Sequence, residues 1–492
     1  MVRVLFVVQD LSYEPQGLMW LSSVLKASGY QVALAAADQE DPVAFAASWD
    51  PDILGYSVMT GSQRAYLDLN RAIRAGIDPL RRKQGKSQVF SAFGGPHLTF
   101  FPEMIEEEGV DGVCIGEGEG AIIDLARALS DGDGCVRSPI ANWWLKVDGD
   151  ILKAEPRPLI RELSSLPPPD RALVYDKSRA LAAGAIKHFI SSRGCPYNCT
   201  YCFNHAYYQI YRRERRGQQR AVDEVIAEVN AVRARWPLKQ AVFLDDLFVV
   251  NTEWLEELAE KWPARVGIPF FCNARANLLV KDPRKVEFLK KAGCSTVSMG
   301  FETANDRIRT ELLKRRMSRE EMIEAGRMVR GAGMHLTSTN ILGLPTSTLD
   351  DDLATMRLSA EARVSYAFSL LFQPYPGTEL GRYVQDRQLT SATLDDIGEI
   401  AWDHTVLHLN GEADRRARER LQRLFAIGVE WPVLEPLIRW ITNLPGWRVI
   451  DISLWWVHKL HKGFAIYTRV HRHSAGPLEL FRDALHFLKL KS

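Results

Sequence analysis

The sequence has no long hydrophobic run and almost no net charge. Of its 492 residues, 62 are Lys or Arg and 61 are Asp or Glu, so the formal net charge is +1. This balance removes any bulk attraction to nucleic acid, which requires a concentrated basic excess. No stretch reaches the roughly 18 uncharged apolar residues of a membrane span. The apolar run after Arg3 meets Asp10 without the small-residue cleavage site of a signal peptide. We therefore expect a soluble, cytoplasmic protein that does not bind nucleic acid.

Cysteine is also scarce. The seven cysteines are too few and too unevenly placed for a disulfide-stapled fold. Three of them, Cys195, Cys199 and Cys202, form one cluster with spacers of three and two residues. The remaining four are scattered along the chain, as small buried hydrophobic cysteines usually are. These four are Cys114, Cys135, Cys272 and Cys294.

The composition and length of the chain predict an ordinary globular protein of several domains. Hydrophobic residues make up 46% and charged residues 25% of the chain, as is usual for a globular protein. At ~100–200 residues per domain, the length predicts two to four domains.

The first part of the chain predicts an α/β domain. Residues 1–140 alternate apolar runs with helical patterns, which predicts a Rossmann-like, doubly wound parallel sheet. The expected strands are Val2–Val8, Val32–Ala35, Ile53–Ser57, Val89–Phe93 and Gly112–Ile115.

The alternation resumes later in the chain. Residues 141–180 are rich in proline, and we expect a semi-rigid connector there. Residues 181–400 contain six strand candidates separated by helical patterns, too few to close an eight-stranded barrel. They predict a partial (β/α)6 barrel of TIM type with its site at the carboxyl ends of the strands. Residues 401–492 lose the alternation and are expected to be mainly helical. The six expected strands are Ile186–Ser191, Gln240–Asp245, Pro269–Asn273, Thr296–Phe301, His335–Leu342 and Tyr366–Phe372.

The cysteine cluster follows the first of these six strands. Three thiolates held in a loop can ligate three irons of a cubane 4Fe–4S cluster, which leaves the fourth iron open to a substrate or cofactor. A structural zinc site normally needs a fourth Cys or His ligand. His205 is near enough in the sequence to keep that alternative open.

The Cys-x-x-x-Cys-x-x-Cys motif, with Tyr201 before its last cysteine, resembles that of the radical S-adenosylmethionine superfamily. The resemblance implies that the open iron binds the amino and carboxylate groups of S-adenosylmethionine. One electron from the cluster would then release a 5′-deoxyadenosyl radical. Residues at the ends of the second and third strands would bind the methionine part, with Asp245 and Asp246 near the amine and Arg275 near the carboxylate.

Two further strand ends extend this resemblance. Glu302 closes the fourth strand, where polar side chains of the superfamily meet the ribose, and Gly343 follows the fifth, near the adenine. We take Asp246 and Glu302 as the catalytic candidates. Each of these residues, taken singly, also suits an ordinary surface or ion-pair position.

The first domain resembles the cobalamin (B12)-binding domain that precedes the barrel in one large subgroup of that superfamily. No Gly-x-Gly-x-x-Gly follows its first strand, so a dinucleotide fingerprint is missing. Four segments carry the resemblance: Pro15–Leu18, Ser57–Met59, Gly94–His97 and Gly116–Glu119. It implies that Ser57 and the glycine pair line the slot for the nucleotide tail. The candidate cobalamin residues are Glu14, Gly17, Leu18, Ser57, Met59, Gly94, Gly95, Pro96, Gly116, Glu117 and Gly118.

One position departs from cobalamin domains that supply an axial ligand through Asp-x-His-x-x-Gly. Alignment on Gly17 puts Glu14 at the histidine position and Ser12 at the aspartate position. The resemblance then implies a cobalt without a protein nitrogen below it. Whether Glu14 or a water approaches the cobalt stays open.

The two resemblances together imply a cobalamin-dependent methyltransferase that acts on an unactivated carbon. The deoxyadenosyl radical would abstract a hydrogen atom from the substrate carbon. Methylcobalamin facing the barrel mouth would supply the methyl group to this carbon, and a second S-adenosylmethionine would remethylate the reduced cobalamin. A flavodoxin- or ferredoxin-type protein would donate the electron. Two alternatives stay open: a non-methylating enzyme such as an oxidative cyclase or ring-rearranging enzyme, and an inactive cobalamin sensor or carrier.

The C-terminal region lies outside both resemblances. Residues 430–492 hold five of the thirteen tryptophans. We expect these aromatics to pack on the barrel, with peripheral membrane contact by the segment around Leu454–Lys462 as the less favoured alternative. Either arrangement suits a large apolar small-molecule substrate, such as a lipid, a tetrapyrrole or a secondary metabolite.

Overall fold

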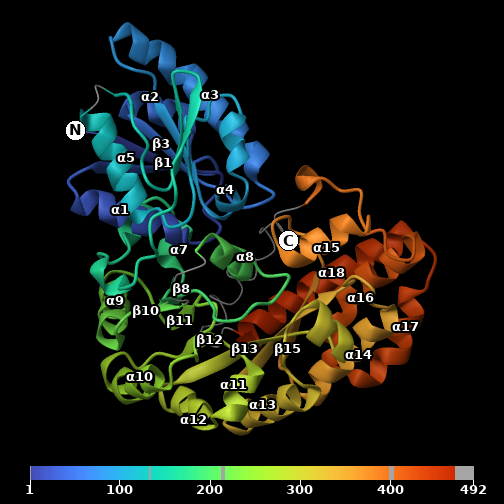
Figure 1. Ribbon diagram of the computed structural model, residues 1–492. Coiled ribbons are helices and arrows are strands. Elements are labelled where there is room, and N and C mark those ends of the chain that lie inside the picture. The colour runs from blue at the N-terminus through green and yellow to red at the C-terminus, as the bar shows by residue number, and fades with distance from the viewer. Residues whose placement is uncertain (1, 132–133, 212–216, 398–403, 471–492) are drawn as a thin grey trace. The chain divides into compact units, whose positions relative to one another are not determined.

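The computed structural model describes residues 2–131, 134–211, 217–397 and 404–470 (Figure 1). The chain divides into two compact units. The first comprises Met1–Gly184 and Tyr207–Arg215, and the second comprises Ala185–Ala206 and Arg216–Ser492.

The first unit is built on a seven-stranded sheet in the order β2-β1-β3-β4-β5-β6-β7. The first five strands are parallel, and their interior residues are almost entirely buried, as strands covered on both faces must be. This confirms the predicted doubly wound domain. The strands are β1 (Arg3–Val8), β2 (Gln31–Ala36), β3 (Ile53–Ser57), β4 (Phe90–Gly94), β5 (Gly112–Cys114), β6 (Trp143–Val147) and β7 (Asp150–Lys153).

Helices form two layers over this sheet, since α1 packs on α5 and α2 packs on α3. Helix α2 begins with a capping carboxylate, because the Asp41 side chain accepts a hydrogen bond from the Val43 amide. The helices are α1 (Gln16–Ala27), α2 (Pro42–Trp49), α3 (Gln63–Lys83), α4 (Pro96–Phe100), α5 (Glu119–Asp131), α6 (Arg171–Tyr175) and α7 (Arg179–Ala183), with short 3-10 turns at Pro102–Glu106 and Leu163–Ser165.

The stretch expected to be a connector differs from that expectation. Strands β6 and β7 form an antiparallel hairpin that extends the sheet beyond β5. The turn between them is Asp148-Gly149, and both residues have positive φ, 51° and 91°, as a tight two-residue hairpin turn requires. The proline-rich remainder folds back on the same unit, where the Ser23 hydroxyl donates to the Pro168 carbonyl at 2.5 Å.

The second unit is an open, curled sheet of six parallel strands that follow the order of the sequence, β8-β11-β12-β13-β14-β15 (Figure 1). This confirms the predicted partial barrel. The strands are β8 (Ile186–Phe189), β11 (Gln240–Phe243), β12 (Phe270–Ala274), β13 (Cys294–Glu302), β14 (His335–Leu342) and β15 (Tyr366–Leu371). A two-stranded ribbon, β9 (Ser192–Arg193) with β10 (Gln218–Gln219), lies after β8.

Helices separate the strands of this barrel. Two of them begin with a capping box, at Ser318 and at Thr348. The helices are α8 (Phe203–Ile210), α9 (Val222–Arg235), α10 (Thr252–Arg265), α11 (Ala276–Lys281), α12 (Arg284–Lys291), α13 (Arg319–Gly331), α14 (Leu349–Glu361) and α15 (Glu379–Asp386), with short turns at Ile308–Leu312 and Leu394–Asp396.

The C-terminal region is helical, as predicted. It consists of α16 (Glu412–Glu430), a short turn at Pro432–Leu434, α17 (Glu435–Thr442), α18 (Arg448–Ala465) and a final turn at Ile466–Val470. Helix α16 packs on β15 and α14, and it also contacts α17 and α18. None of the helices in the described ranges is long and apolar enough to cross a membrane.

The expected packing of the C-terminal tryptophans on the barrel is wrong for four of them. Trp431, Trp440, Trp447 and Trp456 are 46%, 61%, 59% and 50% exposed. The residues that dock α17 and α18 are instead smaller ones, including Ile438, Thr442 and Leu454. Trp402 lies outside the described residues.

Candidate functional site

A cavity of about 210 Å³ opens at the carboxyl ends of the barrel strands in the second unit. It gathers seven of the predicted site residues: Cys195, Cys199, Cys202, Tyr201, Asp246, Arg275 and Glu302. Parallel strands bring residues from distant parts of the sequence to this one edge, which is where TIM-type barrels hold their sites. The remaining lining residues are Tyr197, Asn204, Leu247, Asn273, Ala274, Ser298, Gly300, Arg315 and Thr339.

The three cysteines lie in the loop between β9 and α8. Two arginines approach the sulfur of Cys199: a guanidinium nitrogen of Arg275 and one of Arg315 each lie 3.8 Å from it. Both arginines are at least nine-tenths buried. Two cations this close to one buried sulfur complement the negative charge that a cysteine sulfur carries as a metal ligand. Burial raises the pKa of Cys195, and it raises the pKa of Cys202 to about 12.

Glu302 reaches the cavity because the end of β13 is irregular. The pairing of β13 with β14 shifts between Gly300 and Glu302, and Glu302 has a φ of 62°, in the left-handed region. A side chain at position 300 would meet the Glu302 carboxylate at 2.1 Å and the Arg315 guanidinium at 2.6 Å, so it would displace both groups from their present positions. Strained backbone of this kind is typical of functional sites.

Tyr201 joins Glu302 to Arg315. Its hydroxyl donates to the Glu302 carboxylate at 2.9 Å and accepts from Arg315 at 3.0 Å. Arg315 also donates to the Gly300 carbonyl, at 2.6 Å from Nη2. Burial raises the pKa of Glu302. The cavity therefore has a wall of one buried acid, one phenol and one guanidinium, suited to a polar ligand that carries both charges.

The adjacent aspartates Asp245 and Asp246 lie in different surroundings. Asp246 is exposed and lines the cavity, and its carboxylate accepts from the Gly194 amide at 3.2 Å. Asp245 is buried behind it, where its carboxylate accepts from the Ser191 amide at 3.0 Å and the Ser191 hydroxyl at 2.6 Å. Burial raises the pKa of Asp245. Asp245 thus connects the ends of β8 and β11, and it does not line the cavity.

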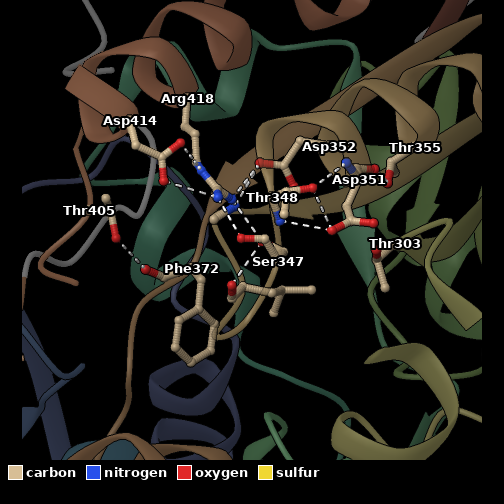
Figure 2. Close-up of polar contacts among 12 residues, drawn as sticks. Thr303, Ser347, Thr348, Asp351, Asp352, Thr355, Phe372, Thr405, Asp414 and Arg418 are labelled. Carbon is tan, nitrogen blue, oxygen red and sulfur yellow. Dashed lines mark hydrogen bonds and ion pairs between the residues drawn. The ribbon is translucent and has the colours of Figure 1, made fainter. Parts of the chain in front are cut away.

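Gly343 also lies away from the cavity lining. Its amide donates to the Asp352 carboxylate at 3.1 Å, and the same oxygen accepts from Arg418 of α16 at 2.9 Å. Figure 2 shows Arg418 pointing into this loop, where it also donates to the Ser347 hydroxyl at 2.7 Å and carbonyl at 2.6 Å. Asp414, one turn before Arg418 on α16, accepts from it at 3.1 Å. A helix outside the predicted barrel therefore holds the loop after β14.

The sequence did not predict several cavity residues. Asn273, Ser298 and Thr339 lie on β12, β13 and β14, and a period-two pattern of polar residues at those strand ends could have indicated them. Arg315 comes from the loop between β13 and α13, where the run Lys314–Arg316 resembles any solvated surface segment.

The described residues contain no group of three or more His, Cys, Asp or Glu side chains gathered tightly enough for a single metal ion. His205, the zinc alternative, lies 3.7 Å from Glu379 through Nε2. Three thiols spread around one cavity match a multi-iron cluster, whose ligands bind different metal atoms.

The first unit brings together its own set of predicted residues at the ends of β3, β4 and β5. Gly95 has a φ of 95°, and a side chain there would meet the Val58 amide at 2.8 Å and the Ser57 hydroxyl at 3.0 Å. Gly116 has a φ of 83°, and a side chain there would overlap the Tyr211 hydroxyl. These glycines leave backbone exposed at the edge where open α/β sheets bind ligands.

Other candidates of the first unit have structural contacts. Glu14 is 5% exposed and bonded to the Tyr175 hydroxyl, with Arg171 at 3.8 Å. Burial raises the pKa of Tyr175. Leu18 is 1% exposed and belongs to the core. The Glu117 carboxylate accepts from the Ile160 amide at 2.6 Å, whereas Met59 is 45% exposed.

Two family models match the chain. The B12 binding domain matches residues 2–126, and the radical SAM superfamily matches residues 189–359. The matched ranges contain the glycine edge of the first unit and the cysteine cavity of the second.

Three known proteins are similar to this chain. An uncharacterized methyltransferase of Pyrococcus horikoshii is 29% identical over 340 residues, which cover 68% of this chain and 70% of the relative. An anaerobic magnesium-protoporphyrin IX monomethyl ester cyclase of Rubrivivax gelatinosus is 23% identical over 390 residues, which cover 76% and 67%. The solved structure of OxsB, a cobalamin-dependent S-adenosylmethionine radical enzyme, matches 99% of this chain and 79% of its own with a TM-score of 0.70 at 14% identity.

Proposed function

This chain belongs to the radical SAM superfamily and carries a B12-binding domain, and we propose that it is a cobalamin-dependent methyltransferase acting on an unactivated carbon of a small molecule. Its cofactors are a 4Fe–4S cluster, S-adenosylmethionine and cobalamin. One observation carries the proposal: a chain with both domains places three cysteines and a set of buried charges around one cavity at the barrel mouth. The relative named a methyltransferase supports the choice of reaction.

We assign Cys195, Cys199 and Cys202 as ligands of the cluster. Support comes from their place on one cavity and from the two guanidinium groups near Cys199, whose positive charges complement a metal-bound cysteine sulfur. When bound, the cluster supplies the electron that cleaves S-adenosylmethionine, and cobalamin supplies the methyl group.

The same cavity fits S-adenosylmethionine by charge. We assign Asp246 to the amine, because this exposed carboxylate lines the cavity beside the cysteine loop, and Arg275 to the carboxylate. Glu302, fixed by Tyr201 and Arg315, is assigned to the ribose hydroxyls. Gly343 is not assigned to the ligand, because it lies away from the cavity lining in the loop that Arg418 holds. Asp245 takes a positioning role, since it binds Ser191 and lies behind Asp246.

Cobalamin is assigned to the glycine edge of the first unit. Ser57, Gly94 and Gly95 would accept its nucleotide tail, because a side chain at position 95 would close the space beside Ser57. Met59, Pro96, Gly116 and Gly118 would border the same slot, and so would Gly17 in the first turn of helix α1. The carboxylate of Glu14 is bonded to Tyr175 and close to Arg171, which argues for a cobalt without a ligand from this residue.

A second reaction, oxidative cyclisation, is favoured by one observation: the Rubrivivax relative is named a cyclase. In either case the substrate would be apolar, and a flavodoxin- or ferredoxin-type protein in the cytoplasm would donate the electron. The reconstituted protein, kept anaerobic with cobalamin and reductant, is given S-adenosylmethionine with a deuterated methyl group and extract of a strain lacking the protein. Mass spectrometry then follows deoxyadenosine and the heavy methyl group.

A methylase produces a labelled extract component together with deoxyadenosine. A substrate-dependent but unlabelled product would favour the cyclase. Failure of the reduced protein to form any deoxyadenosine would overturn both reactions and revive the alternative of an inactive cobalamin carrier.

A further inference from the structure

Residues 207–211 follow the cysteine loop in the sequence but belong to the first unit. There Tyr208 and Tyr211 form one buried apolar cluster with Leu159. The ring of Tyr207 packs on that of Tyr211, with 4.9 Å between the ring centroids. The first unit therefore takes a group of tyrosines from the part of the chain that was expected to belong to the barrel.

The hydroxyl of Tyr211 lies directly against Gly116, a glycine just after β5. A Cβ atom at position 116 would lie 1.8 Å from this hydroxyl oxygen, and the three closest atoms beyond the adjacent residues would all belong to Tyr211. Gly116 also has a φ of 83°, a conformation that is strained for residues with a side chain. The absence of a side chain at position 116 therefore gives the hydroxyl its place.

Thr99 connects this position to the glycine pair assigned to cobalamin. Its hydroxyl accepts a hydrogen bond from the Gly116 amide at 3.1 Å and donates one to the Gly95 carbonyl at 3.1 Å. Strands β4 and β5, which these two glycines follow, are adjacent and parallel. The Tyr211 hydroxyl therefore lies at the same edge of the sheet as Gly95, one strand further along.

The Tyr211 hydroxyl is buried without a hydrogen bond. The residue is 6% exposed. The Tyr207 side chain and the Glu117 amide lie near its oxygen, but neither forms a hydrogen bond with it, and no other described residue does. Nearly all buried polar groups of native proteins have a partner, so a hydroxyl left without one indicates a ligand that supplies it. Burial raises the pKa of Tyr211, so the phenol is neutral and remains a hydrogen-bond donor.

We propose that the Tyr211 hydroxyl donates a hydrogen bond to an amide side chain of cobalamin. The inference rests on the proposed function, because it requires cobalamin at the glycine edge of the first unit. Cobalamin carries neutral amide side chains around its corrin ring, and the carbonyl oxygen of such an amide accepts from a neutral donor. Gly95 and Gly116 leave the backbone at this edge uncovered, so a large ligand can come close enough to reach the hydroxyl.

The test is a titration of the full chain with aquacobalamin in the absence of S-adenosylmethionine, read from the visible absorbance of the bound cofactor. Tyr211→Phe keeps the ring and removes only the hydroxyl. We expect its Kd for cobalamin to be about three- to ten-fold higher than that of the wild type, as for the loss of one hydrogen bond to a neutral group. The absorption maxima of the bound cobalamin stay the same, because the hydroxyl binds an amide and not the cobalt.

Tyr208→Phe is the matched control. Its ring belongs to the same cluster and is 4% exposed, but none of the three atoms closest to a Cβ atom at position 116 belongs to it. We expect this variant to keep the Kd of the wild type. Far-ultraviolet circular dichroism and the Tm without cobalamin show whether both variants fold.

A wild-type Kd in Tyr211→Phe overturns the proposal, even if its Tm falls, since the hydroxyl would then have a structural role alone. An equal rise in Kd for Tyr208→Phe also overturns it, because the packing of the aromatic cluster would explain both losses. Shifted absorption maxima in Tyr211→Phe would make the cobalt, and not an amide, the partner of the hydroxyl. A wild type that binds no cobalamin overturns the cofactor assignment of the proposed function as well, an outcome distinct from a variant that binds as the wild type does.

Discussion

Single residues set the charge of the barrel cavity. Cys199 is buried, and guanidinium nitrogens of Arg275 and Arg315 each lie 3.8 Å from its sulfur. These two positive charges complement the negative charge that a cysteine sulfur carries as a metal ligand. Arg275 also packs over the ring of Tyr197, 3.9 Å from its centroid, which holds the guanidinium plane in place.

This arrangement makes Cys199 a sharp test of the cluster assignment. Cys199→Ala removes one of three ligands, so we expect loss of the iron and sulfide bound after reconstitution and a fall of deoxyadenosine formation to background. The matched control is Cys135→Ala, which removes an exposed thiol of the first unit and leaves both measurements unchanged. A Cys199→Ala protein that still cleaves S-adenosylmethionine reductively would refute the assignment.

The residues that sequence reasoning found are those at strand ends. Asp246, Arg275 and Glu302 follow apolar runs, and parallel topology brings such positions to one edge. Arg315 was missed because it reaches the cavity from a loop, and only the folded chain brings it to Tyr201. The sequence predicts Asp245 as a ligand residue as readily as Asp246, because it does not show which member of an acidic pair is exposed and which is buried.

At the scale of elements, apolar periodicity identified the strands well and polar turns less well. The strands His335–Leu342 and Ile53–Ser57 have the predicted bounds, since most of their residues are buried. The hairpin of β6 and β7 was overlooked beside its proline-rich neighbour, although Asp148-Gly149 is a strong hairpin signal. The exposure of Trp440 and Trp456 contradicts the favoured expectation that they pack on the barrel, because periodicity shows that a helix has an apolar side and not what covers it.

Helix α16 stabilises the loop after β14 through Arg418, whose side chain is fully buried (Figure 2). Arg418→Met leaves Asp352 buried without its cation, which costs about 3–5 kcal/mol locally. We expect faster amide hydrogen exchange over residues 343–348, measured by mass spectrometry. Arg415→Met, on the same helix but partly exposed, is the control and leaves that exchange unchanged. Unaltered exchange in Arg418→Met would contradict the role of α16.

The contact of α18 with α16 is sensitive to acid through His458. Burial, with the charge of Lys462 next, lowers the pKa of His458 from 6.5 to about 4. Between these pH values the folded protein binds fewer protons at His458 than the unfolded chain does. The contribution of His458 to the free energy of unfolding is therefore full above pH 6.5 and is lost as the pH falls toward 4.

His458→Gln should reduce this loss of unfolding free energy at low pH, because glutamine does not titrate. Its amide can still donate to the Arg423 carbonyl that His458 contacts at 3.2 Å. Thermal unfolding between pH 4 and 8 measures the effect, expected to be on the order of 3 kcal/mol at the acid end. His408→Gln, at an exposed position, serves as the control. Parallel pH profiles for wild type and His458→Gln would disprove the prediction.

At the scale of the whole molecule, the two candidate sites belong to separate compact units. The glycine edge lies wholly in the first unit and the cysteine cavity wholly in the second. Each unit has its own sheet, so a local change in one should leave the binding chemistry of the other intact.

Gly95→Val tests this separation. A side chain at position 95 would meet backbone atoms of Val58 at 2.8 Å and 3.0 Å, which cannot yield as a flexible side chain does. We expect at least about ten-fold weaker cobalamin binding, read from the visible spectrum after reconstitution, since a misfit of ~1.4 kcal/mol already produces that factor. The visible absorbance of the iron–sulfur cluster in the second unit remains the same as in the wild type.

The control for Gly95→Val is Gly29→Val, which places the same side chain at a similar φ of 85° but in open space. It shares the backbone strain of the test variant and lacks the steric contact, so it retains cobalamin. If both variants lost cobalamin equally, strain in the sheet and not the slot at Gly95 would explain the effect. If Gly95→Val lost the cluster as well, the two units would not bind their cofactors independently.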